Sequence, residues 1–177
     1  RTIRLLAVSK TFPVELIEEA YRAGQRHFGE NRVQEAETKI PEVGAADLEW
    51  HLIGHLQSNK ARGAVELFDV IQTLDSEKIA RKVDRYSQDQ GKRMPVFIEV
   101  KVGGEPQKQG VEPERIGEMI EIVDSLANLS LRGLMTMPPY HEDSGRSRPY
   151  FRKMRELLEG INRSRAAPLT ELSMGMT

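Results

Sequence analysis

The feature that most constrains the fold is a regular alternation of short apolar segments with longer amphipathic segments along all 177 residues. The apolar segments have the length of buried strands, and the segments between them repeat apolar residues at helical spacing. Pro41 is expected to end the second helix, and Ser76 to provide the N-cap of the fourth. The pattern predicts strands at 3–10, 27–31, 48–56, 70–76, 95–102, 129–137 and 169–176. It predicts helices at 14–24, 32–40, 59–68, 77–91, 113–126 and 147–164.

This alternation predicts a parallel sheet covered by helices, and two architectures compete for it. A doubly wound sheet uses five or six strands. A (β/α)8 barrel of the TIM type uses eight strands in about 250 residues. Seven strands in 177 residues favour a single barrel domain over 1–177 that lacks its last βα unit. Because an open barrel leaves two strand edges unpaired, we expect the natural chain to continue past Thr177.

The composition narrows the range of partners. The 26 basic residues nearly cancel the 27 acidic ones, which gives no general electrostatic reason to bind nucleic acid or an anionic membrane. The chain has no cysteine, which excludes disulfides, thiolate catalysis and cysteine-based zinc sites. No apolar run approaches the about 20 residues that span a bilayer. We therefore expect a cytoplasmic protein with neither nucleic acid nor membrane as partner.

Lys10 is the most informative residue at a predicted strand end. Functional groups of such barrels gather at the C-terminal ends of the strands, and Lys10 follows an apolar run there. An amine that points into a barrel mouth would be partly desolvated, which lowers its pKa and favours attack on an aldehyde. A solvated lysine at the end of a strand is the plainer alternative, and the residues alone leave both open.

Other candidate sites have plainer explanations. His51 and His55 are four apart on one strand and so share a face, and a metal site would add Glu49 or Asp75. No third ligand is fixed by spacing, so a hydrogen-bonded histidine pair is favoured over a metal site. The run at 146–155 mixes basic and aromatic residues. It could bind RNA, although a solvated helix face with inward aromatics is favoured. Met135 and Met137 are expected to fill the core.

Several motifs together resemble one family. The stretches LLAVSKTFP, HFGENRVQEAETKI, EWHLIGHLQSNKAR, LRGLMTMPPY and LSMGMT occur in this order along the chain. They are similar to the pyridoxal 5'-phosphate (PLP) homeostasis proteins, also described as the proline synthase co-transcribed family. The resemblance implies the barrel of the alanine racemase N-terminal domain, incomplete at both ends here, with the last βα unit and an N-terminal helix missing.

The resemblance also implies a cofactor site. Lys10, in the AVSK motif, corresponds to the lysine that holds PLP as a Schiff base. Asn31 of FGEN and residues Ser173, Met174 and Gly175 of SMGM correspond to positions that line the cofactor pocket. Lys108 corresponds to a lysine implicated in alternative attachment or transfer of PLP. No residue is assigned a catalytic or metal-binding role.

The implied function is PLP homeostasis or delivery to PLP-dependent apoenzymes, by a monomer without established catalytic turnover. One alternative is a fold-type III PLP enzyme such as an amino-acid racemase, which needs an acid and a base on opposite faces of the cofactor. A second alternative is a barrel without PLP that binds RNA or a protein through its basic sixth helix. A racemase assay and a PLP-binding assay would separate these functions.

Overall fold

The computed structural model describes residues 2–103, 109–139 and 143–175 and contains seven strands. The strands are β1 (Ala7–Val8), β2 (His27–Glu30), β3 (Glu49–Leu52), β4 (Val70–Leu74), β5 (Met94–Glu99), β6 (Leu129–Thr136) and β7 (Glu171–Met174). The α-helices are α1 (Val14–Arg22), α2 (Val33–Val43), α3 (Ala61–Leu67), α4 (Glu77–Asp89), α5 (Ile116–Asp124) and α6 (Arg148–Asn162). Short 3-10 turns, η1 (Pro113–Arg115) and η2 (Ser144–Ser147), precede α5 and α6.

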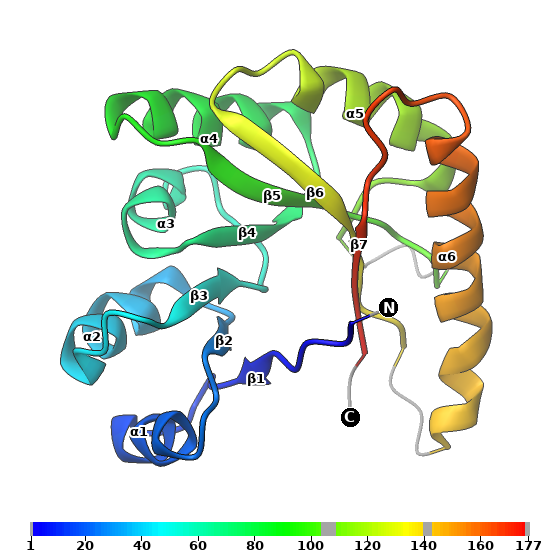
Figure 1. The fold of residues 1–177 in the computed structure, drawn as a ribbon. Helices are drawn as coiled ribbons and strands as arrows, with labels where there is room; N and C mark the ends of the chain where they lie inside the picture. Colours follow the sequence, from blue (N-terminus) through cyan, green and yellow to red (C-terminus); the bar gives the residue numbers. More distant parts are fainter. Residues whose placement is uncertain (1, 104–108, 140–142, 176–177) are drawn as a thin grey trace.

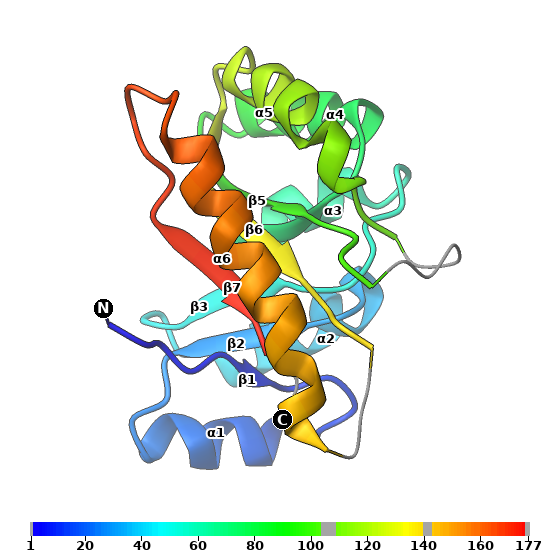
Figure 2. The same cartoon turned by 90° about the vertical axis from the view of Figure 1, so that its right-hand side faces the viewer.

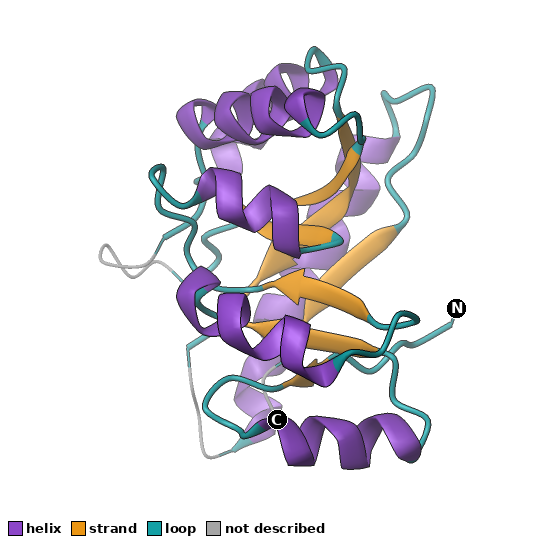
Figure 3. Cartoon of the chain, turned by 90° about the vertical axis from the view of Figure 1, so that its left-hand side faces the viewer, coloured by secondary structure: helices purple, strands orange, loops and turns teal. Residues whose placement is uncertain are grey.

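The strands form one sheet in sequential order from β1 to β7, and every neighbouring pair is parallel. The sheet curls strongly, and the helices cover its outer side (Figure 1). Viewed from the left-hand side of Figure 1, α1 to α4 lie one above another outside the strands (Figure 3). The expected seven-stranded incomplete barrel is therefore confirmed.

The core has two parts, one on each side of the curled sheet. Most buried apolar side chains lie between the strands and the outer helices, where the rings of Phe28 and Trp50 pack 5.5 Å apart. Val70, Phe97 and Met135 form a separate small cluster. Burial of both layers accounts for central strands, such as β5, that are apolar along most of their length.

The two ends of the sheet approach each other. Figure 2 shows α6 covering β7, with the segment before β1 running nearby. Arg4, in that segment, forms a 2.7 Å ion pair with Glu171 of β7. Among the described residues no strand lies between β1 and β7, so these two strands are the edges of the sheet.

Two sequence-based expectations about helix ends need correction. Pro41 lies inside α2, which ends at Gly44 in the left-handed conformation with φ of 62°. The helix continues past the proline because Val43 is buried in the core, and this packing outweighs one lost backbone donor. Ser76 occupies the N-cap position of α4, but its hydroxyl donates to the Asp75 carboxylate instead of accepting a helix N–H.

Candidate functional site

Lys10 lies in a tight turn directly after β1. The turn is closed by the Phe12 N–H, which donates to the Ser9 carbonyl at 3.1 Å, and the Ser9 N–H donates to Gly29 of β2. Thr11 has a φ of 65°, as the third position of a type II turn requires. The backbone therefore fixes the point from which the Lys10 side chain leaves the sheet.

A buried polar network supports this turn from beneath. The Glu30 carboxylate accepts from the Ser9 hydroxyl at 2.7 Å and from Lys39 Nζ at 3.0 Å. Lys39 also donates to the Ser9 carbonyl and to Glu35, and Glu35 accepts from the Thr11 N–H at 2.6 Å. Through these contacts β2 and α2 hold both sides of the turn that carries Lys10.

The network shifts the pKa values of its members. Burial alone would lower the pKa of Lys39, but its hydrogen bonds to Glu35 and Glu30 outweigh burial and raise that pKa. The hydrogen bond from Lys39 lowers the pKa of Glu35. Both groups are therefore charged at neutral pH, and the Lys39 amine stays hydrogen-bonded to its carboxylate partners.

Lys10 itself is exposed, and the expectation of a sheltered amine is wrong for the part of the chain that the structure describes. The physical reason is that β1 is an edge strand there, so no neighbouring strand covers the side of the turn toward β7. No hydrogen bond or ion pair engages Lys10 within the described residues. The amine is accessible, in contrast to that of Lys39.

Asn31 follows β2 and is half-buried against the loop after β3. A methyl group on Gly54 would lie 2.1 Å from the Asn31 carbonyl oxygen, so only glycine fits there. The close approach places the β2 and β3 ends side by side, as expected for residues at one end of a barrel.

The predicted site residues of β7 divide between the two faces of the sheet. The Ser173 hydroxyl donates to the Gln72 amide oxygen on β4, across the inside of the curl. Met174 lines a hollow beside α6, because successive side chains of a strand alternate. Gly175 has a φ of 128°, a conformation that favours glycine. Lys108 lies outside the described residues.

Two titratable groups near the C-terminal ends of the central strands were not predicted as site residues. The Glu99 carboxyl is buried on β5, and burial, helped by the Asp75 charge, raises its pKa to about 7. Asp75 follows β4 and pairs with His55 at 3.2 Å. His55 and Asp75 also line a hollow of about 420 Å³. The sequence analysis considered His55 with Asp75 only as possible metal ligands, and spacing did not add Glu99 because the three residues come from three different strand ends.

The histidines, the basic helix α6 and the two methionines considered from the sequence do not form one site. His51 lies inside the curl and His55 at the mouth of the 420 Å³ hollow, so the expected pair of histidines is not formed. In α6, Tyr150 packs against the core, while Arg152 is exposed and lines the hollow beside Met174. Met135 is buried as predicted, whereas Met137 is exposed, contrary to the prediction.

Comparisons with known proteins identify relatives of this chain. The sequence profile of the alanine racemase N-terminal domain family matches residues 2–177. A pyridoxal phosphate homeostasis protein of Aquifex aeolicus is 44% identical over 174 residues, which are 98% of this chain and 76% of that protein. The chain belongs to the pyridoxal phosphate homeostasis protein family. A protein of the same name from Haemophilus influenzae is 42% identical and covers 99% of this chain and 76% of its own length.

Solved structures extend the comparison from the sequence to the fold. PipY of Synechococcus elongatus, in a structure with PLP bound, has a TM-score of 0.91 at 41% identity and covers 99% of this chain and 82% of its own. An alanine racemase of Clostridium difficile has a TM-score of 0.73 at 16% identity, covering 97% of this chain and 50% of its own. The likeness to the racemase shows a shared fold alone. No helix in the described part of this chain is long and apolar enough to cross a membrane.

Proposed function

We propose that this protein binds PLP through a Schiff base at Lys10 and takes part in PLP homeostasis or delivery, without catalytic turnover. Relatives at 40–44% identity carry the name pyridoxal phosphate homeostasis protein. The PipY structure, at 41% identity, has PLP bound. These likenesses extend over nearly all of the chain and support the same ligand for it.

The observation that carries the proposal is the setting of Lys10. The residue follows β1 at the C-terminal end of the sheet, and hydrogen bonds fix the backbone on both sides of it. The nearby Lys39 is buried and donates to two carboxylates, whereas the Lys10 amine is exposed and unengaged in the described part of the chain. A primary amine that is held by neither a hydrogen bond nor an ion pair is available to an aldehyde once it has lost its proton.

PLP supplies an aldehyde when it is bound. In the attachment proposed here the Lys10 ammonium first gives up a proton to solvent. Its nitrogen then bonds to the aldehyde carbon, and one water molecule leaves as the C=N bond forms. The reaction consumes no oxidant or reductant and reverses by addition of water, which suits a protein that holds and releases its ligand.

The proposal extends to the pocket and to the wider role. Asn31, Ser173, Met174 and Gly175 are proposed to line the PLP pocket, and Lys108 to serve as an alternative attachment site. Residues 1–177 are proposed to act as a single PLP-binding barrel domain. PLP-dependent apoenzymes are proposed as the recipients, with the carrier acting as a monomer in the cytoplasm.

A titration with PLP tests this function. Wild-type protein is expected to develop the visible absorption band of a protein Schiff base, and Lys10→Ala is expected to lose it. Lys153→Ala, which removes an exposed lysine on α6, is the matched control and is expected to behave as wild type. A wild-type protein that stays colourless with PLP overturns the proposal. Interconversion of D- and L-alanine that depends on Lys10 would replace the carrier role with that of a racemase.

A further inference from the structure

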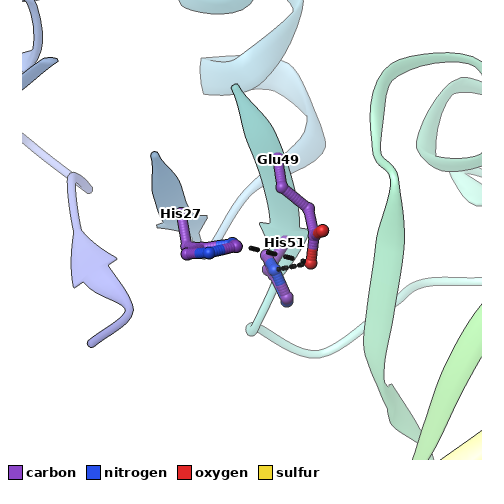
Figure 4. Close-up of side chains that lie close together, drawn as sticks. All are labelled: His27, Glu49 and His51. Carbon is purple, nitrogen blue, oxygen red and sulfur yellow. Dashed lines mark ion pairs between the residues drawn. The ribbon is translucent and has the colours of Figure 1, made fainter. Parts of the chain in front are cut away.

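Three potential metal ligands converge inside the curled sheet, at the end opposite Lys10. His27 and Glu49 are the first residues of β2 and β3, and His51 lies two residues further along β3. Figure 4 shows the three side chains turned toward one another. Glu49 Oε1 lies 2.8 Å from His51 Nε2 and 3.7 Å from His27 Nδ1, and the ligand atoms of the three residues all lie within 4.8 Å of one another.

Two of these atoms are buried without a hydrogen-bond partner. Glu49 Oε1 and His51 Nε2 are shielded from solvent, and neither makes a hydrogen bond of acceptable geometry although they lie 2.8 Å apart. His51 as a whole is only 8% exposed. A buried polar atom without a partner destabilises the fold, because it has given up its hydrogen bonds to water. Both atoms would be satisfied by one cation held between them.

The other ring nitrogen of His51 has a polar partner on β4. His51 Nδ1 lies 2.8 Å from the Gln72 side-chain amide on β4. The oxygen of the same amide accepts from the Ser173 hydroxyl, so Gln72 is held between β7 and the histidine. Such an outer partner orients a ligating histidine.

One positive charge competes for the same carboxylate. Arg132 Nη1 lies 3.7 Å from Glu49 Oε1, too far for a hydrogen bond, and its side chain is 30% exposed. Arg132 can therefore turn toward solvent when a divalent ion takes its place beside Glu49. The side chains of His27 and Glu49 are each 29% exposed, which leaves room for water to complete the coordination shell.

We propose that His27 Nδ1, Glu49 Oε1 and His51 Nε2 bind a divalent transition-metal ion of the zinc class. Two imidazoles and one carboxylate suit Zn²⁺, and a bond length of about 2.0 Å at tetrahedral angles separates ligand atoms by about 3.3 Å. The separations of 2.8 and 3.7 Å bracket that value. The ion would tie β2 to β3 at the N-terminal end of the barrel, a role independent of PLP.

Zinc titration by calorimetry, on protein first treated with a chelator, tests the site. Wild type is expected to bind one equivalent of Zn²⁺. Glu49→Gln and His27→Ala are each expected to weaken binding about 10- to 100-fold. His55→Ala is the matched control, because His55 is an exposed histidine paired with Asp75 outside the cluster. It is expected to bind as wild type.

Glu49→Gln is the deciding variant because it keeps the shape of the side chain, and circular dichroism checks that each variant is folded. Unchanged affinity in folded Glu49→Gln, or no zinc binding by wild type, overturns the proposal. Lys10→Ala is expected to keep its zinc affinity, so the outcome is separate from that of the PLP titration. Loss of binding in His55→Ala would instead place the ion at the 420 Å³ hollow and contradict the assignment.

Discussion

Glu99 lies at the end of β5 with its side chain closed off from solvent. Burial, and then the nearby charge of Asp75, raise its pKa from an ordinary 4.5 to about 7. The folded protein therefore keeps a proton on Glu99 at pH values where the unfolded chain has lost it. Folding therefore takes up this proton. The stability that the protonated Glu99 carboxyl gives the folded protein is complete below about pH 4.5 and is lost as the pH rises through 7.

Glu99→Gln should remove this pH dependence, because glutamine does not ionise. Relative to the variant, wild type is expected to lose up to about 3 kcal/mol of unfolding free energy between pH 4.5 and 8. Urea denaturation at a series of pH values measures the difference, with the exposed Glu121→Gln on α5 as the control. Parallel stability curves for wild type and Glu99→Gln would contradict the prediction.

For single residues, the sequence predicted the place of a residue along the strands and helices better than the burial and contacts of its side chain. An apolar run that ends in lysine predicted Lys10 at the C-terminal end of a strand, and the structure has it in the turn two residues after β1. The exposure of Lys10 depends on which strand lies beside β1, and a local pattern does not contain that information. Lys39 was missed although it lies on the buried stripe of α2 with Ala36 and Val43, a signal that spacing could have revealed.

Among the elements, the junction of β1, β2 and α2 is held together by charge as well as by packing. Lys39 on α2 contacts the buried Glu30 of β2 and the carbonyl of Ser9 after β1. Removal of one partner from such a buried pair leaves the other charge without compensation. The turn that carries Lys10 therefore depends on a residue 29 positions further along the chain.

Lys39→Met should destabilise the fold by about 3–5 kcal/mol, because Glu30 would be left buried without its cation. Denaturation in urea measures the loss. Lys153→Met, which changes an exposed lysine on α6, is expected to stay within about 0.5 kcal/mol of wild type. Equal stability of the two variants would show that the buried pair does not hold the junction.

The pairing of β6 with β7 requires a glycine at 133. A methyl group there would lie 1.8 Å from the carbonyl oxygen of Glu171, its partner across the ladder. Gly133→Ala should therefore cost about 3 kcal/mol or more. Gly117→Ala on the exposed face of α5 meets no atom within 4 Å and should gain about 0.5–1 kcal/mol. Thermal unfolding compares them, and equal melting temperatures would refute the steric argument.

Over the whole molecule, the sequence predicted the order and type of the elements, and the number of strands, together with the family motifs, predicted the curl of the sheet. Periodicity sufficed because central strands such as β5 are mostly apolar and the helices repeat apolar residues at helical spacing. It could not predict which side chains meet inside the curl. His27, Glu49 and His51 come together through the parallel register of β2 and β3, in which His27 lies opposite Glu49 and Gly29 opposite His51. Motifs treated one strand at a time did not bring His27 into any site.

The most direct test of the account is to locate the bond to PLP. Protein equilibrated with PLP is reduced with borohydride, which makes a Schiff base permanent, and is then digested for peptide mass spectrometry. We predict that the phosphopyridoxyl group is found on Lys10 in the peptide around the AVSK motif, and that Lys39 is unlabelled because its amine is buried in ion pairs. Label spread over exposed lysines such as Lys153, with Lys10 unmodified, would contradict it.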